Sequence, residues 1–309
     1  MRKLRLNWLL LVGVILALVL QVQGAVAPKT FQLTILHSND FHGANLPSLA
    51  RQATLIKEIR AKEANVIVLN GGDVFTRGSY HRNFYGQLEF DVLNAMQTDV
   101  MTLGNNEFKA TGDLTAQQYL YARINQAKFP VLCANVLLEK DGSYLPNVKP
   151  YIVKKISEMR IGILGVSANR IQEYAQVKGF IVQDQIEAAK KIFPKVAAES
   201  DIVIALTHIG YQPDRVLAEA VPGLAVIVGA DSHTLLKEPV TVGKIPIVQA
   251  GENGEYLGRL DLNFEYSGKA WVLKSFQGKV IKLDNTIKED PEIKAIIDRY
   301  LATLQKKAA

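Results

Sequence analysis

Cysteine is almost absent from this chain, which excludes the small proteins that are held together by disulfides. The single cysteine, Cys133, has no partner for an intramolecular bond and lies in the apolar stretch 129–136, so we expect a buried structural thiol. Clusters of Lys and Arg interleaved with aromatic residues are also lacking, which argues against a nucleic-acid polymer as partner. The 309 residues, 48% of them hydrophobic, have an ordinary globular composition and can form one large core or two modest ones.

A long apolar run is present only near the N-terminus, and it is too short for a membrane-spanning helix. It extends over 13 residues from Trp8 to Leu20, whereas a transmembrane helix needs about 20. Basic residues precede the run and a stretch of small and polar residues follows it, which is the order of a secretory signal. We therefore predict a signal peptide at residues 1–27, a single domain at 28–309, and export to the periplasm or the extracellular space without stable membrane insertion after cleavage.

From residue 31 onward, short β-branched or Leu-rich runs alternate with longer helical patterns, as in a sheet covered by helices. The pattern becomes strand-like after residue 238, and the last segment, 290–307, predicts a closing amphipathic helix. We therefore expect an α/β fold. The earlier runs predict strands at 33–36, 66–69, 100–103, 131–134, 161–166, 202–206 and 225–228, helices at 49–63, 89–96, 114–127, 185–198 and 215–220, and later strands at 239–242, 245–249, 258–264 and 271–276.

Five of the expected strands end in segments rich in side chains that bind metal ions. Loops at the carboxyl ends of strands converge on one edge in open α/β sheets, so these side chains are expected to lie within reach of one another. Mixed carboxylate, imidazole and amide ligands suit Mn, Zn, Fe or Ni better than Ca. Because seven ligands exceed the needs of one ion, we predict two ions about 3.5 to 4 Å apart that share a carboxylate. The seven candidates are Asp40, His42, Asp73, Asn105, His208, Asp231 and His233.

Each of these residues alone has a simpler interpretation. An Asp after a strand more often caps a helix than binds a metal, and a lone histidine such as His208 is more often a satisfied core residue. The two D-x-H pairs favour the metal hypothesis, since two ligands two positions apart can point to one ion from a loop. Outside the set, we expect His37 to orient a ligand or loop and His81 to lie on the surface.

Taken together, the motifs resemble the calcineurin-like metallophosphoesterases. The likeness is to the catalytic domain of the bacterial 5'-nucleotidase, UDP-sugar hydrolase and 2',3'-cyclic-nucleotide phosphodiesterase family, and it extends over about residues 31 to 265. It implies a layered β-sandwich flanked by helices, with a dinuclear metal site at the carboxyl ends of the strands. The segments that carry the resemblance are 35–43, 69–73, 101–105, 129–135 and 249–260.

The resemblance also implies a ligand set and a reaction. Asp40, His42, Asp73 and His233 would hold the first ion; Asp73, Asn105, His208 and Asp231 would hold the second, with Asp73 as the bridge. The cofactors would be two divalent ions, Mn, Zn, Fe, Ni or Mg. The reaction implied is hydrolysis of phosphate monoesters or nucleotides, in which a metal-bound hydroxide attacks phosphorus in line.

Three departures from the family pattern bear on activity. Asn106 and Lys109 stand where the family has a His and an Asp that stabilise the transition state, and loss of such a donor costs about 100- to 1000-fold in rate. Asn106 still offers a neutral donor and Lys109 a cation, so we take them as the candidate catalytic residues. Asp231 stands where the family usually has His and adds negative charge, which favours Mn- or Mg-like ions. Only about 45 residues follow the last motif, so the nucleobase-binding domain of larger relatives is not expected.

These departures keep two alternatives open. The chain could be a catalytically weakened homologue that binds metal or a phosphate ligand without turning it over. It could also hydrolyse sulfur esters, because a related branch of the superfamily uses the same metal scaffold for such substrates. No motif in the sequence favours the sulfur-ester alternative.

Overall fold

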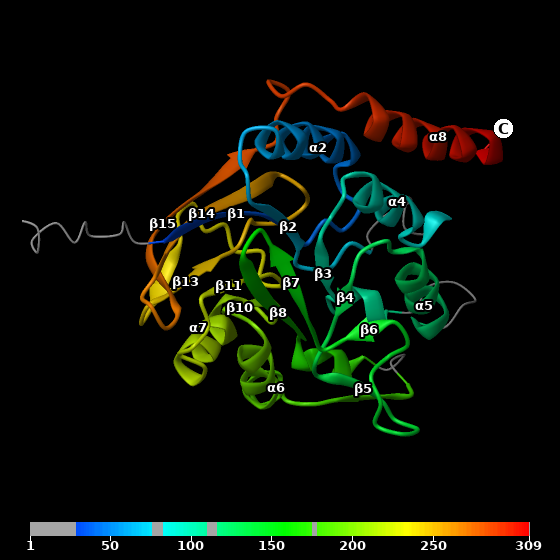
Figure 1. Ribbon diagram of the computed structural model, residues 1–309. Helices are drawn as coiled ribbons and strands as arrows, with labels where there is room; N and C mark the ends of the chain where they lie inside the picture. Colours follow the sequence, from blue (N-terminus) through cyan, green and yellow to red (C-terminus); the bar gives the residue numbers. More distant parts are fainter. Residues whose placement is uncertain (1–28, 76–82, 110–115, 175–177, 309) are drawn as a thin grey trace, which may run out of the picture.

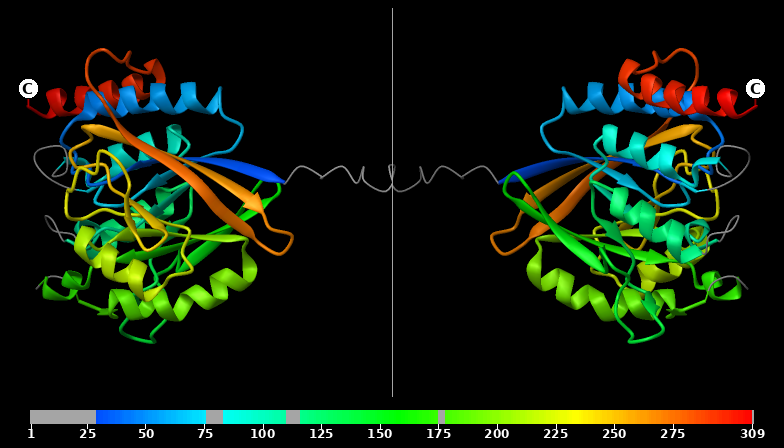
Figure 2. Two further views of the ribbon diagram at one scale, coloured as in Figure 1. Left: turned by 90° about the vertical axis from the view of Figure 1, so that its left-hand side faces the viewer. Right: turned by 90° about the vertical axis from the view of Figure 1, so that its right-hand side faces the viewer.

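The computed structural model describes residues 29–75, 83–109, 116–174 and 178–308. The expected signal segment and His81 lie outside these residues. Two mixed sheets pack face to face, and helices cover both outer faces of the pair (Figures 1 and 2). The predicted α/β layered sandwich is therefore confirmed. No helix in the described part of the chain is both long and apolar enough for a membrane span.

The first sheet carries the N-terminal half of the chain and closes with two late strands. Its order is β15-β14-β1-β2-β3-β4-β6. Strands β1, β2, β3, β4 and β6 run parallel to one another, whereas β14 pairs antiparallel with both β1 and β15. The bounds are β1 Thr30–Ser38, β2 Val66–Asn70, β3 Val100–Thr102, β4 Val131–Leu132, β6 Val148–Lys149, β14 Tyr256–Tyr266 and β15 Trp271–Lys282.

The second sheet has a parallel centre and antiparallel edges. Its order is β12-β13-β11-β10-β8-β7, and a separate pair, β5-β9, lies outside both sheets. The bounds are β7 Tyr151–Ile156, β8 Met159–Ser167, β10 Ile202–His208, β11 Val226–Val228, β12 Val240–Val242, β13 Ile245–Val248, β5 Val136–Leu138 and β9 Phe180–Val182.

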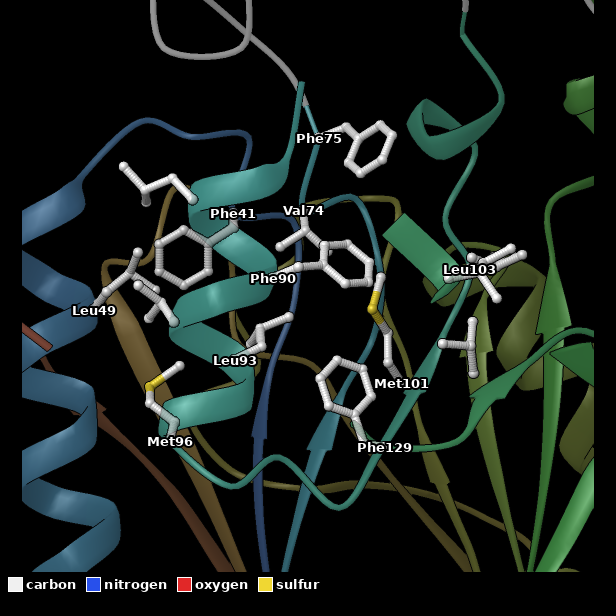
Figure 3. Packing of buried hydrophobic residues seen from close by; sticks show 14 of the residues in the cluster. Phe41, Leu49, Val74, Phe75, Phe90, Leu93, Met96, Met101, Leu103 and Phe129 are labelled. Carbon is white, nitrogen blue, oxygen red and sulfur yellow. The ribbon is translucent and has the colours of Figure 1, made fainter. Parts of the chain in front are cut away.

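Three hydrophobic layers hold these sheets and helices together. One lies between the sheets and is built from alternate residues of the central strands; a second lies between the second sheet and its two helices. The third lies between the first sheet and four helices, where aromatic residues such as Phe41, Phe90 and Phe129 pack around α4 (Figure 3). The helices are α2 Leu46–Arg60, α4 Gln87–Ala95, α5 Ala116–Gln126 and α8 Pro291–Ala308 on the first sheet, and α6 Gln185–Glu199 and α7 Tyr211–Ala220 on the second.

The two sheets approach each other closely near the carboxyl ends of their strands. Gly165 in β8 faces Leu132 in β4, and a Cβ at Gly165 would stand 2.3 Å from the Leu132 Cβ. Any side chain at this position would push the sheets apart. The glycine thus brings the loops that follow the strands of one sheet within reach of those of the other.

Glu107, in the short 3-10 helix η1 (Asn106–Phe108), fastens the loop after β2 to the loop after β3. The side chain is fully buried. Its Oε2 accepts from the backbone N–H of Asp73 and Gly104 at 3.0 and 2.7 Å, and its Oε1 accepts from Val74 and Phe75 at 2.8 and 3.1 Å. Burial, with a contribution from Asp73, raises the pKa of Glu107 to about 7, whereas the N–H donors act to lower it. One carboxylate thus satisfies four buried N–H groups.

We expect Glu107→Gln to destabilise the protein by about 2 kcal/mol or more, because an amide nitrogen cannot accept the N–H bonds on its side and buried donors lose their acceptor. Thermal or urea unfolding measures the change. Glu219→Gln, an isosteric change at an exposed position on α7, is the matched control, and its effect should stay within about 0.5 kcal/mol. Equal stability of the two variants would contradict this role for Glu107.

Candidate metal centre

The structure gathers all seven predicted ligands at one edge of the sandwich, from loops of both sheets. Three loops follow β1, β2 and β3 in the first sheet; the other residues come from the end of β10 and the loop after β11 in the second. Six of the seven are buried, and the seventh, His233, is half-buried. The residues from the first sheet are Asp40, His42, Asp73 and Asn105, and those from the second are His208, Asp231 and His233.

Two groups of side chains are arranged as a metal ion requires. Asp40, His42 and His233 form one group and Asp40, Asp73 and His208 the other, and within each group the ligand atoms all lie within 4.8 Å of one another. Asp40 Oδ1 lies 3.4 Å from Nε2 of His233, and it is buried with no hydrogen-bond partner in the described structure. An acceptor oxygen of this kind, surrounded by imidazole nitrogens, fits a divalent cation.

Asp73 faces both groups, whereas the resemblance made it the only bridge. Its Oδ2 lies 4.0 Å from Nε2 of His42, and its Oδ1 lies 3.3 Å from Nε2 of His208. Asp40 Oδ1 also lies between the groups, 3.8 Å and 3.9 Å from the same two nitrogens. Two carboxylates, not one, therefore stand between the two halves of the centre.

The remaining two candidates complete the half around His208. Asn105 Oδ1 and Asp231 Oδ1 each lie 3.3 Å from Nε2 of His208. This half therefore collects the carboxylates of Asp73 and Asp231, an amide oxygen and an imidazole nitrogen. The other half has Asp40, Asp73 and two imidazoles, so both halves have the mixed donors that Mn, Zn or Fe accept.

Partners behind the histidines fix which ring nitrogen faces the centre. His208 Nδ1 donates to the carbonyl oxygen of Gly71 at 2.6 Å, so Nε2 is the ring nitrogen that faces the centre. His233 Nδ1 lies 2.9 Å from the Glu252 carboxylate, which aims its Nε2 at Asp40. Sequence reasoning did not predict Glu252, although it lies within the 249–260 motif.

Backbone strain is concentrated at the same edge. Among the described residues other than glycine, ten have a positive φ, and five of these are predicted ligands: Asp40, His42, Asp73, Asp231 and His233, with φ between 51° and 83°. The left-handed region is costly for residues with a Cβ and persists where the surroundings enforce it. The backbone of these ligand loops therefore adopts locally unfavourable conformations, and in these conformations the side chains point toward the centre.

The buried groups of the cluster shift one another's pKa values. The carboxylates of Asp73 and Asp40 raise the pKa of His208 well above its usual value, although burial acts to lower it. Burial acts to raise the pKa of Asp73, yet His208 and His42 hold it at about 2. Asp73 therefore stays ionised beside the histidines although it is buried, and a buried charge of this kind is stabilised by a bound cation.

Asn106, a predicted catalytic residue, points into the ligand set. Its backbone N–H donates to Asp73 Oδ1 at 2.7 Å, and its Nδ2 donates to Asp73 Oδ2 at 2.5 Å. The same Nδ2 lies 3.4 Å from Nδ1 of His42. Asn106 thus orients the carboxylate that faces both halves of the centre.

Lys109, the other predicted catalytic residue, lies farther out. Its Nζ stands 4.9 Å from the centroid of the Tyr174 ring, a cation–π contact. The Tyr174 hydroxyl accepts from Nδ2 of Asn105 at 2.7 Å. The partly buried Tyr174 ring therefore connects Lys109 to Asn105, a predicted ligand.

A sixth loop, which sequence reasoning missed, also reaches the centre. It follows β8 and forms the 3-10 helix η2, Asn169–Glu173, which brings Arg170 to Asp231 and Asn105. The sequence did carry a sign of this loop, because the apolar run at 161–166 is followed by the polar residues Ser167 and Asn169, as the other five runs are followed by polar residues. Pairing of β8 with β10, with Ser167 beside His208, is what places this loop at the site.

Cys133 and His37, which lie outside the ligand set, are both buried in the protein core. Cys133 is fully buried, with its Sγ 3.2 Å from Ser167 Oγ, and burial raises its pKa, so the predicted buried thiol is confirmed. His37 lies in β1 with its ring against Gly258, and burial lowers its pKa to about 4. It is therefore a neutral side chain of the core, and its Nδ1 has no hydrogen-bond partner in the described structure.

Similarity to known proteins agrees with this geometry. The chain is 31% identical to a snake venom 5'-nucleotidase of Naja atra, over 89% of this chain and 58% of that protein, and 30% identical to a human 5'-nucleotidase, over 92% and 55%. The crystal structure of a 5'-nucleotidase precursor from Thermus thermophilus superposes with a TM-score of 0.79 at 26% identity, covering 89% of this chain and 59% of that one. The chain thus spans a little over half the length of these relatives.

The similarity also places the chain in a family. Residues 33–235 match the family described as calcineurin-like phosphoesterase, and this range contains all seven candidate ligands together with Asn106, Lys109 and Arg170. The relatives named above are hydrolases of phosphate esters. With the sandwich, the donor groups and the matched range in agreement, the chain belongs to the calcineurin-like phosphoesterase family.

Proposed function

We propose that the chain is an exported, metal-dependent phosphoesterase that hydrolyses phosphate monoesters or nucleotides with two divalent ions. The observation that carries the proposal is the convergence of seven donor side chains from both sheets, six of them buried and His233 half-buried. Asp40 and Asp73 stand between His208 on one side and His42 on the other. The predicted signal segment and the venom origin named for one relative support export.

In this proposal the two halves of the centre hold one ion each. Asp40, His42, Asp73 and His233 would hold the first; Asp73, Asn105, His208 and Asp231 would hold the second. When bound, the ions would supply the Lewis acidity that polarises a phosphoryl oxygen and lowers the pKa of a water. The donor set suits Mn, Zn, Fe, Ni or Mg.

The chain's own residues would orient this chemistry. Asn106 fixes Asp73 through a bond to each carboxylate oxygen, and Gly71 fixes the ring of His208. Lys109 would supply positive charge at the outer side of Asn105. Asn106 and Lys109 stand where the family has a charged His and Asp pair, so we expect phosphoryl transfer to be slower here than in an enzyme with that pair.

Metal content and turnover test the proposal directly. Protein loaded with Mn²⁺ should carry two ions per chain by elemental analysis and hydrolyse an aryl phosphate only when Mn²⁺ is present. Asp73→Asn should reduce both quantities, with a loss of turnover beyond the roughly 10- to 100-fold that loss of an outer partner costs. Asp298→Asn, at an exposed acid on α8 paired with Lys294, is the control and should behave as wild type.

The outcomes separate the alternatives. Two ions without turnover on aryl phosphates or nucleotides would favour a protein that binds metal or a phosphate ligand. Hydrolysis of sulfur esters that thiosulfate-like compounds inhibit, in preference to phosphate esters, would favour the sulfur-ester reaction. A chain that takes up no metal under any loading condition would contradict the proposal.

Restoration of the family pair tests the replaced catalytic residues. The double variant Asn106→His with Lys109→Asp should raise kcat by up to about 100-fold, because a charged, oriented donor stabilises the transition state better than an amide. The two single variants are the controls, since the pair needs both members. Metal content should stay unchanged in all three. A fall in kcat from a substantial native rate would mean instead that Asn106 and Lys109 work by a mechanism of their own.

A further inference from the structure

Arg170 differs from every other residue at the centre, because it carries a permanent positive charge onto the proposed metal ligands. Its Nη2 donates to Asn105 Oδ1 at 2.7 Å and forms an ion pair with Asp231 Oδ1. The side chain is 44% exposed, whereas that of Asp231 is 6% exposed. The guanidinium therefore reaches in from the protein surface and ends on two oxygens of the buried cluster.

The two oxygens that Arg170 engages belong to the same half of the centre. Each lies 3.3 Å from Nε2 of His208, so one guanidinium nitrogen and one imidazole nitrogen share them. An ion held by these three atoms would lie beside the guanidinium. The guanidinium and a metal ion that bind the same oxygens would repel each other strongly in a partly buried site. An oxygen that already accepts a charge-assisted hydrogen bond is also a poorer metal ligand.

The other half of the centre is different. Asp40 Oδ1, in the group with His42 and His233, is buried and has no hydrogen-bond partner in the described structure. Asp40 Oδ2 accepts from two neutral donors, Nδ2 of Asn39 and the backbone N–H of Asp231. The two halves thus present similar donors, but only the half around His208 has ligand oxygens that contact the guanidinium of Arg170 in the described structure.

We propose that Arg170 is a built-in cation that competes with the second metal ion for Asn105 and Asp231, so that the two halves bind metal with unequal affinity. The inference rests on the proposed two-ion function. It also gives the unusual acid at position 231 a partner: the carboxylate that stands where the family usually has His is matched by an arginine from the loop after β8. The second ion binds only as the guanidinium leaves these oxygens.

The test is calorimetric titration of the metal-free full chain with Mn²⁺, which measures both dissociation constants without any substrate. In Arg170→Met the first dissociation constant should stay within about 2-fold of wild type, and the second should fall about tenfold or more because a neighbouring positive charge is gone. Arg160→Met is the matched control: Arg160 is also an exposed arginine paired with an aspartate, Asp201. It removes the same charge far from these loops, so both constants should match wild type.

A second pair of variants tests the role of the carboxylate. In an Asp231→His background Arg170 has no acid to pair with, so the additional change Arg170→Met should alter the second dissociation constant by less than about 3-fold. Thermal unfolding verifies that each variant is folded, which we expect because Arg170 is at the surface.

The results distinguish failure of this inference from failure of the function on which it rests. Tighter binding of the second ion in Arg170→Met, or two ions in the variant where wild type binds one, supports the competition. Two ions in both proteins with an unchanged or weaker second constant overturns it and leaves the proposed function intact, since Arg170 would then merely position Asn105 and Asp231. Fewer than two ions in every variant overturns both.

Discussion

The burial of three carboxylates in one cluster is the constraint on which this structure depends. Asp40, Asp73 and Asp231 stand within a few ångströms of three imidazoles, at an edge where both sheets end. Isolated charges in such a place would cost several kcal/mol each. The protein offsets that cost with backbone N–H donors, with histidines and with Arg170, and the arrangement remains rich in oxygen acceptors directed at one small volume.

Much of the remaining architecture positions that cluster. Gly165 lets the sheets approach, Glu107 fastens two ligand loops through four backbone N–H groups, and five ligands adopt left-handed backbone conformations. Each of these features is unfavourable alone: a glycine weakens a strand, a buried acid needs many donors, and positive φ is strained. Together they hold the seven side chains close to one another at a single edge of the sandwich.

The sequence predicted the central strands, and it predicted which side chains would gather at one edge, because both leave strong local signals. Buried parallel strands are continuous apolar runs, and the ligands follow them directly, as Asp73 follows β2. The edge strand β7 was missed because its burial is partial and its sequence carries Lys154 and Lys155. The short strands β5, β6 and β9 were missed as well, since two or three residues do not establish a period.

Arg170 was missed for a different reason. Its loop follows an apolar run as the others do, but an arginine in a polar loop normally indicates a solvated surface, and its partners lie 61 and 65 residues away along the chain. Only the pairing of β8 with β10 brings them together. The same holds for Glu252, whose bond to His233 depends on the loop after β13 returning to the centre.

The replacements at the centre are easier to understand as a set than singly. A His at position 231 would be a neutral ligand, whereas Asp231 adds a negative charge that Arg170 balances. At position 106 the family has a charged donor, whereas the amide nitrogen of Asn106 contacts Asp73 and His42. Two cations therefore stand near the centre, Arg170 in the loop after β8 and Lys109 in the loop after β3, where it contacts the Tyr174 ring. If the proposed function holds, these two cations would help to set where positive charge meets an anionic substrate, and such contacts accelerate hydrolysis only where they are stronger in the transition state than in the bound substrate.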